Sequence, residues 1–423
     1  MIVLTVFPML LLIGIIFLRC LMVFEITPRI SKAIFCPIGD SPTGCQGRSF
    51  RTSRVFFGAI GLRLVLLLAA IAAVMIRTNA ELSLEECFQQ MQHWDAIHYT
   101  KLVDLGYSGY MENEQHLFLV FFPGYVWLVR FIRLLVPNTV VTGMAVSSLC
   151  YAGGCCFLFK LVEGYYNAEI ARDSVIYLSL FPFSLFFGFV MTEGLFLLTT
   201  TAACFYAQQK KWLFYGIWGF FAALTRMTGI LVIVPALIEI ISNRQSEFPL
   251  GKRVVSLIRK IPLLLMPILG SGIYLLLNAV IDGNPMAFLI HQKHWHQGYM
   301  WLPEVIQYVW NLVCEKLHTS IGWSIWLPTF LMFFVFLGIL LLSSRDLKNP
   351  LSLLAFAFCY FVASYSLTWL LSAGRYMSCC FPMFIFLARL TAERPSLKRC
   401  LQGVGAVFTG IYLFAYVSGA QVM

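Results

Sequence analysis

The chain has 423 residues, of which 60% are hydrophobic and 12% are charged, and its formal net charge is +10. A soluble domain carries about 25% charged residues, so this composition excludes a water-soluble globular protein. The mean hydropathy of +0.80 instead indicates a polytopic membrane protein. The apolar runs lack the two-residue alternation of barrel strands, so membrane helices are the predicted structure.

Twelve apolar runs along the chain are candidates for membrane crossings. They are residues 2–24, 55–76, 139–160, 174–190, 194–208, 212–225, 229–241, 261–281, 320–342, 351–371, 377–390 and 401–421. The four runs between residues 174 and 241 are separated only by small polar breaks, which predicts compact hairpins of short or tilted helices. We therefore predict an all-α polytopic membrane protein with about 12 crossings.

Basic residues predict which loops face the cytoplasm, because Lys and Arg are enriched there. Residues 25–54 and 242–260 carry five Lys or Arg residues each. The shorter basic stretches 208–211, 343–348 and 389–399 are assigned to the same side. We divide the chain into an extra N-terminal helix with its basic cytoplasmic loop, residues 1–54, and a transmembrane domain, residues 55–423.

Residues 117–135 decide the topology, because a crossing there would move every later basic loop to the other side. As a helix, residues 124–133 place Gly124, Trp127, Arg130 and Arg133 on one face. A helix with one polar stripe prefers to lie in the interface, so we place this segment flat on the outer surface. Both chain ends are then outside, and residues 77–138 and 282–319 form two large external loops.

The first external loop concentrates groups that can move protons. On a helix, Asp95, His98 and Tyr99 would share one face. A carboxylate beside a partly desolvating surface can serve as a general base near neutral pH. Glu112 follows closely enough in the chain to return towards Asp95. The alternative is a solvated loop carboxylate next to a histidine, and the chemistry of the residues alone leaves both interpretations open.

Other charged groups interrupt nearly pure hydrocarbon sequence at predicted helix ends. They are Thr192-Glu193, Thr225-Arg226 and Gly374-Arg375-Tyr376. Charged groups at membrane depth are costly and usually mark a site or a paired partner. The fork of donors of an arginine suits a lipid phosphate, and interfacial snorkelling is the alternative. Arg63 lies inside the second apolar run, and the sequence suggests no partner for it.

The order of these residues resembles the PIG-V family, which comprises GPI mannosyltransferase II and its bacterial relatives. The matching positions are Trp94-Asp95, His98-Tyr99, Gly106-Tyr107, Glu112, Phe121-Phe122-Pro123-Gly124-Tyr125, Glu193, Thr225-Arg226 and Arg375-Tyr376. The resemblance runs from about residue 60 to 390. It implies a GT-C glycosyltransferase fold with interfacial helices in the first external loop. Val126 departs from the second proline that bacterial relatives often carry, which leaves the acceptor open.

The resemblance implies a glycosyltransferase that moves a sugar, typically mannose, from a polyprenyl or dolichyl phosphate to a lipid-linked or cell-surface acceptor, such as a GPI-anchor-like glycolipid. We predict Asp95 as the catalytic base of an inverting displacement, with Arg226 and Arg375 on the phosphate. The other predicted substrate-binding residues are Trp94, His98, Tyr99, Glu112, Tyr125, Glu193 and Tyr376. No metal or cofactor is predicted, because the spacing of His291, His294 and His296 matches no zinc ligand set.

The expected partners are the lipid-linked donor, a membrane-associated acceptor, the bilayer and a small membrane subunit, and no nucleic acid. A bacterial plasma membrane is favoured over the endoplasmic reticulum membrane, with the site on the non-cytoplasmic side. Two alternatives belong to other classes: a lipid or sugar transporter or flippase, and a non-catalytic subunit of a membrane glycosylation complex. The concentration of reactive groups in one external loop argues against a transporter, whose binding groups lie on broken helices near the midplane.

Overall fold

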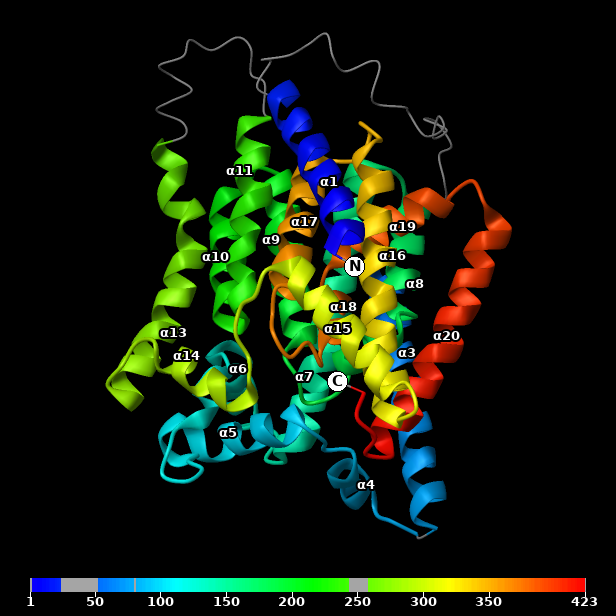
Figure 1. The fold of residues 1–423 in the computed structure, drawn as a ribbon. Helices are drawn as coiled ribbons and strands as arrows, with labels where there is room; N and C mark the ends of the chain where they lie inside the picture. The colour runs from blue at the N-terminus through cyan, green and yellow to red at the C-terminus, as the bar shows by residue number, and fades with distance from the viewer. Residues whose placement is uncertain (1, 24–51, 80, 243–257, 423) are drawn as a thin grey trace.

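The computed structural model describes residues 2–23, 52–79, 81–242 and 258–422, and over these residues it is all-helical (Figure 1). Six helices are long and apolar enough to cross a membrane: Ile2–Met22, Thr52–Thr78, Thr139–Tyr165, Ile258–Asp282, Gly322–Ser344 and Pro395–Val417. Shorter apolar helices span Trp212–Thr225, Met227–Ile241, Leu351–Tyr365 and Phe381–Thr391. The predicted class of all-α polytopic membrane protein is confirmed. Most of the two basic loops, residues 25–54 and 242–260, lies outside the described residues.

The helices follow one another along the chain with short connections. The α-helices are α1 (Ile2–Val23), α3 (Thr52–Thr78), α4 (Leu84–Gln90), α5 (Asp95–Gly109), α6 (Pro123–Ile132), α7 (Thr139–Tyr165), α8 (Ala168–Ser179), α9 (Glu193–Gln208), α10 (Trp212–Thr225), α11 (Ile233–Ile241), α13 (Met266–Asp282), α14 (Ala287–Gln292), α15 (Leu302–Lys316), α16 (Leu327–Ser344), α17 (Leu351–Tyr365), α18 (Ala373–Ser378), α19 (Phe381–Thr391) and α20 (Pro395–Val417). Single turns of other helix types are η1 (Leu117–Val120), η2 (Pro182–Phe187), η3 (Met227–Val232), η4 (Lys293–Trp295) and η5 (Gly322–Trp326).

The predicted crossing at residues 174–190 is wrong as a single helix. Helix α8 ends at Ser179, Pro182 opens the 3₁₀ turn η2, and α9 does not begin until Glu193. Proline lacks a backbone N–H and clashes with the preceding turn, so the helix stops there. Irregular backbone at membrane depth must be covered by protein, and the side chains of residues 183–187 are indeed buried.

The N-terminal end of α9 lies tightly against α7, which is what buries its first residues. A Cβ atom at Gly194 would overlap with the carbonyl group of Ser147, so only glycine permits this approach. The hydroxyl group of Ser147 donates to the Met191 carbonyl at 3.1 Å and fixes the turn before α9. Glu193, next to this glycine, is consequently fully buried.

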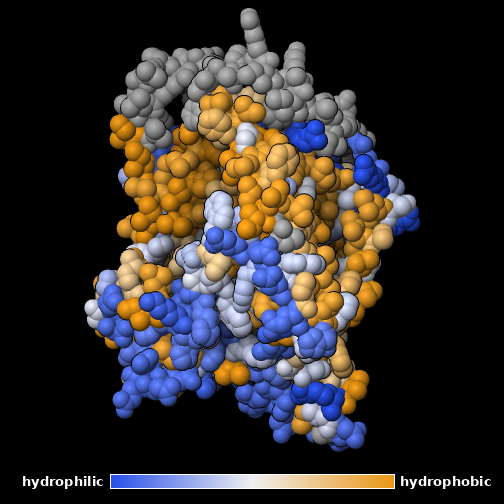
Figure 2. Space-filling view, viewed as in Figure 1, coloured by the Kyte–Doolittle hydropathy of each residue, from blue (hydrophilic) through white to orange (hydrophobic). Residues whose placement is uncertain are grey.

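Residues 81–138, which belong to the predicted first external loop, lie at one end of the molecule. Helices α4, α5 and α6 lie together below the bundle in Figure 1. In the same view, Figure 2 shows a hydrophilic surface over this end and an apolar surface over the helices above it. Helix α6 has ten residues, too few for a span that needs roughly 20. Helix α15, Leu302–Lys316, lies within residues 282–319, the predicted second external loop.

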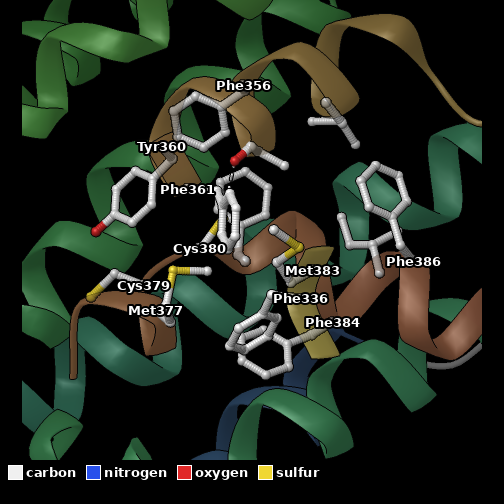
Figure 3. Packing of buried hydrophobic residues seen from close by; sticks show 14 of the residues in the cluster. Phe336, Phe356, Tyr360, Phe361, Met377, Cys379, Cys380, Met383, Phe384 and Phe386 are labelled. Atoms are coloured by element: carbon white, nitrogen blue, oxygen red, sulfur yellow. Dashed lines mark hydrogen bonds between the residues drawn. The ribbon is translucent and has the colours of Figure 1, made fainter. Parts of the chain in front are cut away.

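Helices α16 to α19 pack around a core of aromatic and sulfur-containing side chains. Figure 3 shows Phe336, Phe356, Phe361 and Met383 interdigitating in this cluster, with Cys379 at its edge. The ring centroids of Phe356 and Phe381 lie 5.6 Å apart, within the range of favourable aromatic pairs. This packing provides the rigid wall from which α18 presents Arg375.

Candidate active site

The predicted catalytic carboxylate lies at the first position of a helix. Asp95 opens α5, where a negative charge is stabilised by the positive end of the helix dipole. Trp94 immediately before it has φ 56° and ψ −127°, a conformation that costs a non-glycine residue about 1–3 kcal/mol. The strained turn directs the chain so that the Asp95 side chain, 29% exposed, lines a cavity.

Two arginines and two carboxylates from four separate segments form one ion-pair network. The Nη1 atom of Arg375 lies 2.6 Å from Oδ2 of Asp95, and its Nε lies 2.5 Å from Oε1 of Glu193. The Nη2 atom of Arg226 donates to the same Glu193 oxygen at 2.9 Å. Glu193 therefore links both arginines, and Arg375 links Glu193 to Asp95. Because the two positive and two negative charges balance, the network is formally neutral.

Arg226 has an extended backbone conformation and lies between two helical segments, α10 and η3. It follows the last turn of α10 with φ −153° and ψ 151°, and a positive charge at a helix C-terminus is favourable. Its Nη1 atom lies 3.4 Å from Sγ of Cys379, and its guanidinium carbon lies 5.6 Å from the centroid of the Tyr376 ring. These contacts hold the guanidinium group at the cavity wall.

The network lines a cavity of about 500 Å³ whose walls include nine Phe, Tyr or Trp side chains. Of the predicted residues, those that line it are Trp94, Asp95, His98, Tyr99, Arg226, Arg375 and Tyr376. Glu193 lies behind this wall, where it fixes the two arginines. The structure thus brings together residues that lie up to 282 positions apart in the sequence.

Residues 295–299, in the predicted second external loop, form part of the cavity wall, and the sequence did not predict this. Trp295, Gln297 and Tyr299 line the cavity, and Nε2 of Gln297 donates to the Tyr376 hydroxyl at 3.4 Å. Backbone hydrogen bonds tie this loop to the segment after α17, from Met300 N–H to the Ser366 carbonyl at 2.9 Å. The dense run of aromatic and polar residues from 291 to 301 was the available signal.

His98 lies beside Asp95 in a mainly aromatic environment. Its Nδ1 atom lies 2.9 Å from the Tyr110 hydroxyl, and its ring stacks on Phe118 with the centroids 4.4 Å apart. Burial lowers the pKa of His98, and the charge of Asp95 only partly opposes this shift. The imidazole is therefore neutral at pH 7, so one of its nitrogens donates a hydrogen bond and the other accepts one.

Two predicted substrate-binding residues lie away from the cavity wall. Glu112 is exposed and forms a small backbone bridge with Gln115. Tyr125 is fully buried, and its hydroxyl group lies 2.9 Å from both the Gly143 carbonyl and the Ser147 hydroxyl. Tyr125 therefore anchors α6 to α7, and the local turn at Glu112 directs that side chain to solvent. Neither side chain lines the cavity, and direct contact of either one with the substrate stays a prediction.

His291, His294 and His296 do not form a metal-ligand set. Nε2 of His291 lies 3.3 Å from Oδ2 of Asp282, whereas the rings of His294 and His296 contact Trp295 and Trp369. Within the described ranges, no group of three His, Cys, Asp or Glu residues could hold a metal ion.

Comparison with known proteins gives one family similarity. The family model of dolichyl-phosphate-mannose-protein mannosyltransferases matches residues 122–270, about a third of the chain. This region carries Glu193 and Arg226 but neither Asp95 nor Arg375. No curated protein matches the chain.

Two similar solved structures are oligosaccharyltransferases of Archaeoglobus fulgidus. One is a crystal structure with zinc and sulfate, at 11% identity and a TM-score of 0.47, in which 86% of this chain covers 53% of the other. The second is AglB with an inhibitory peptide and a dolichol-phosphate, at 12% identity and a TM-score of 0.46, in which 86% of this chain covers 56%. The chain thus spans about half the length of these structures.

Proposed function

We propose that this protein is a membrane glycosyltransferase of the GT-C type that takes its sugar from a polyprenyl or dolichyl phosphate. The observation that carries this proposal is the convergence of Asp95, Arg226 and Arg375 on one aromatic cavity. The two arginines suit a phosphate group, and the aromatic walls offer flat apolar faces to a sugar ring. The local match to the mannosyltransferase family model supports a lipid-linked donor, and mannose is the sugar we favour.

In the proposed reaction, Asp95 accepts the proton of an acceptor hydroxyl group, whose oxygen attacks the anomeric carbon of the sugar. The bond between that carbon and the phosphate oxygen breaks, and the lipid phosphate leaves with the bonding electrons. Arg226 and Arg375 stabilise the charge that develops on the leaving oxygen, an electrostatic contribution that often dominates catalysis. Because the attack is a direct displacement, the anomeric configuration is inverted.

Glu193 acts as a positioning residue in this scheme. One of its oxygens holds both arginines, so the phosphate-binding groups are fixed before the donor arrives. Preorganised donors cost no rearrangement at the moment of reaction. Arg375 also contacts Asp95, so a single side chain sets the spacing between the base and the leaving group. His98 completes the site by orienting the acceptor.

The acceptor we propose is a glycolipid or another membrane-associated molecule. The loops that carry Asp95 and Trp295 form the hydrophilic end of the molecule (Figure 2), so an acceptor with a polar head can reach the cavity from that side. We place this end on the non-cytoplasmic side, because the basic loops 25–54 and 242–260 are assigned to the other. A bacterial plasma membrane remains the favoured location over the endoplasmic reticulum.

Transfer by the purified full-length protein tests this function. In nanodiscs, we expect it to move radiolabelled mannose from dolichyl-phosphate or undecaprenyl-phosphate mannose to a membrane lipid extract or, more slowly, to water. Asp95→Asn should lower this rate by about 10²- to 10⁴-fold, the usual contribution of a general base. Glu114→Gln is the matched control, because its carboxylate is exposed in the same loop, and it should keep full activity.

The outcomes separate the competing functions. Full activity in Asp95→Asn would exclude Asp95 as the base. Movement of intact labelled lipid between the leaflets of proteoliposomes, without release or transfer of the sugar, would indicate a transporter or flippase instead. Binding of the labelled donor without either reaction, by the wild-type protein, would indicate a non-catalytic subunit.

A further inference from the structure

A second cavity, of about 340 Å³, lies among α3, α4, α7, the η2 segment and α20. Its walls are almost entirely apolar, and they include Leu64, Leu67, Met144, Leu149 and Leu413. It shares no lining residue with the cavity that contains Asp95. Leu64 and Leu149 are also exposed on the apolar surface of the helices, at 54% each, so the cavity adjoins the hydrocarbon of the bilayer.

One charged side chain, Arg63 of α3, lines this apolar cavity. It is only 4% exposed. Its Nη1 atom donates to the Ser184 carbonyl at 2.5 Å, and its guanidinium carbon lies 4.2 Å from the centroid of the Tyr151 ring. The Nε and Nη2 atoms are buried and have no hydrogen-bond partner. In the part of the chain that the structure describes, no carboxylate lies within ion-pair distance of Arg63.

The Nε and Nη2 atoms of Arg63 determine which kind of ligand could bind there. Nε and Nη2 form one edge of a guanidinium group, with parallel N–H bonds that match two oxygens of a phosphate or carboxylate. Leaving a buried positive charge and two donors unsatisfied is costly in a low-dielectric environment. An anion bound to this edge would remove that cost, and the apolar walls would accept a chain attached to it.

We propose that the Arg63 cavity binds an anionic amphiphile, with its phosphate or carboxylate head on Nε and Nη2 and its hydrocarbon chain against the apolar walls. This site is separate from the proposed donor site and does not depend on the glycosyltransferase function. The η2 turn lies between the two: its Ser184 carbonyl contacts Arg63, and its Phe186 ring lies 5.8 Å from the guanidinium carbon of Arg375.

Photolabelling of the full-length protein in phosphatidylcholine nanodiscs tests the site. The probe is dodecyl phosphate with a diazirine at the end of its chain, and the labelled residues are located by peptide mass spectrometry. We expect label on residues 64–67 and 141–149, counted separately from label at the cavity of Asp95. Unlabelled dodecyl phosphate should compete for it. Dodecanol and inorganic phosphate should not, because each lacks one half of the proposed ligand.

Three variants identify the groups responsible. Arg63→Gln should lower labelling of the cavity by about tenfold or more, the usual effect of losing a hydrogen bond to a charged group. Arg77→Gln removes an arginine from the exposed end of the same helix and should leave labelling unchanged. Ala145→Phe keeps Arg63 but fills the cavity, so it should abolish labelling even where Arg63→Gln does not fold.

Any one of four results would overturn the proposal. Equal labelling of the cavity in Arg63→Gln, or by the corresponding diazirine alcohol, would mean that the anion is not recognised. Competition by inorganic phosphate as effective as that by dodecyl phosphate would mean that the chain is not bound. Unchanged labelling in Ala145→Phe would mean that the label does not enter this cavity.

Discussion

Two of the regions that enclose arginine side chains satisfy the charge in different ways. Arg226 and Arg375 contact Glu193 directly, and Arg375 also contacts Asp95. Arg63, on the other side of η2, contacts a backbone carbonyl and an aromatic ring, and no carboxylate of the described residues lies within ion-pair distance of it. The protein supplies its own anions where the geometry must be fixed before a substrate arrives. Where no anion is supplied, the charge is available to a ligand.

The largest effect that would test this comparison is the loss of Glu193. Glu193→Gln leaves two buried arginines without their shared carboxylate, so we expect a loss of about 3–5 kcal/mol in the free energy of unfolding. Thermal unfolding in detergent or nanodiscs measures it. Glu169→Gln is the matched control, since Glu169 is exposed and its pair with Lys398 spans 3.5 Å, and exposed pairs contribute about 1 kcal/mol or less.

A Glu193→Gln protein that is as stable and as active as the wild type would contradict the comparison. It would show that the arginines find other partners, and that the network is not held by this carboxylate. A stable variant that has lost transfer activity would instead separate positioning from folding, and it would keep Glu193 as the group that orients both arginines.

Replacing Arg63 should not lower the free energy of unfolding, in contrast to replacing Glu193. In nanodiscs without anionic lipid, Arg63→Met removes a buried charge that has no carboxylate, so we expect the protein to be neutral or more stable by about 1 kcal/mol. Addition of dodecyl phosphate should then stabilise the wild type, because a ligand that binds only the folded state raises its stability, and should not stabilise the variant. Unfolding of Arg63→Met at a much lower temperature would show that Arg63 is a structural residue.

The sequence predicts helices well where an apolar run is uninterrupted. The run at residues 212–225 has the bounds of α10, and the run at 55–76 lies within α3. The prediction fails at residues 174–190, where the segment remains apolar but the regular helix ends before Pro182. Hydropathy reports which residues avoid water, and it does not report where backbone hydrogen bonds are interrupted inside a protein core.

The candidate site was predicted in its residue types but not in its pairing. Asp95 is identified from the concentration of proton-transferring groups in its loop, and Arg226 and Arg375 are identified as charges in apolar surroundings. Their direct contacts could not be inferred, since they depend on Gly194 letting α9 approach α7 and on the strained turn at Trp94. Local sequence does not encode such long-range packing, and for the same reason it could not show that Glu112 and Tyr125 lie away from the cavity wall.

The smallest predicted change in stability concerns His98, a titratable residue beside Asp95 of the ion-pair network. Burial lowers the pKa of His98 below the ordinary value of about 6.5. Between its folded pKa and that ordinary value, the unfolded chain therefore binds more protons than the folded one, so the free energy of unfolding falls as the pH decreases. His98→Asn lacks this contribution.

We expect the stability of the wild type relative to His98→Asn to be greatest near pH 7.5 and to decrease once the pH drops below about 6.5, as followed by thermal unfolding. A difference that stays constant down to pH 5.5 would show that the imidazole is more hydrated than its stacking on Phe118 indicates.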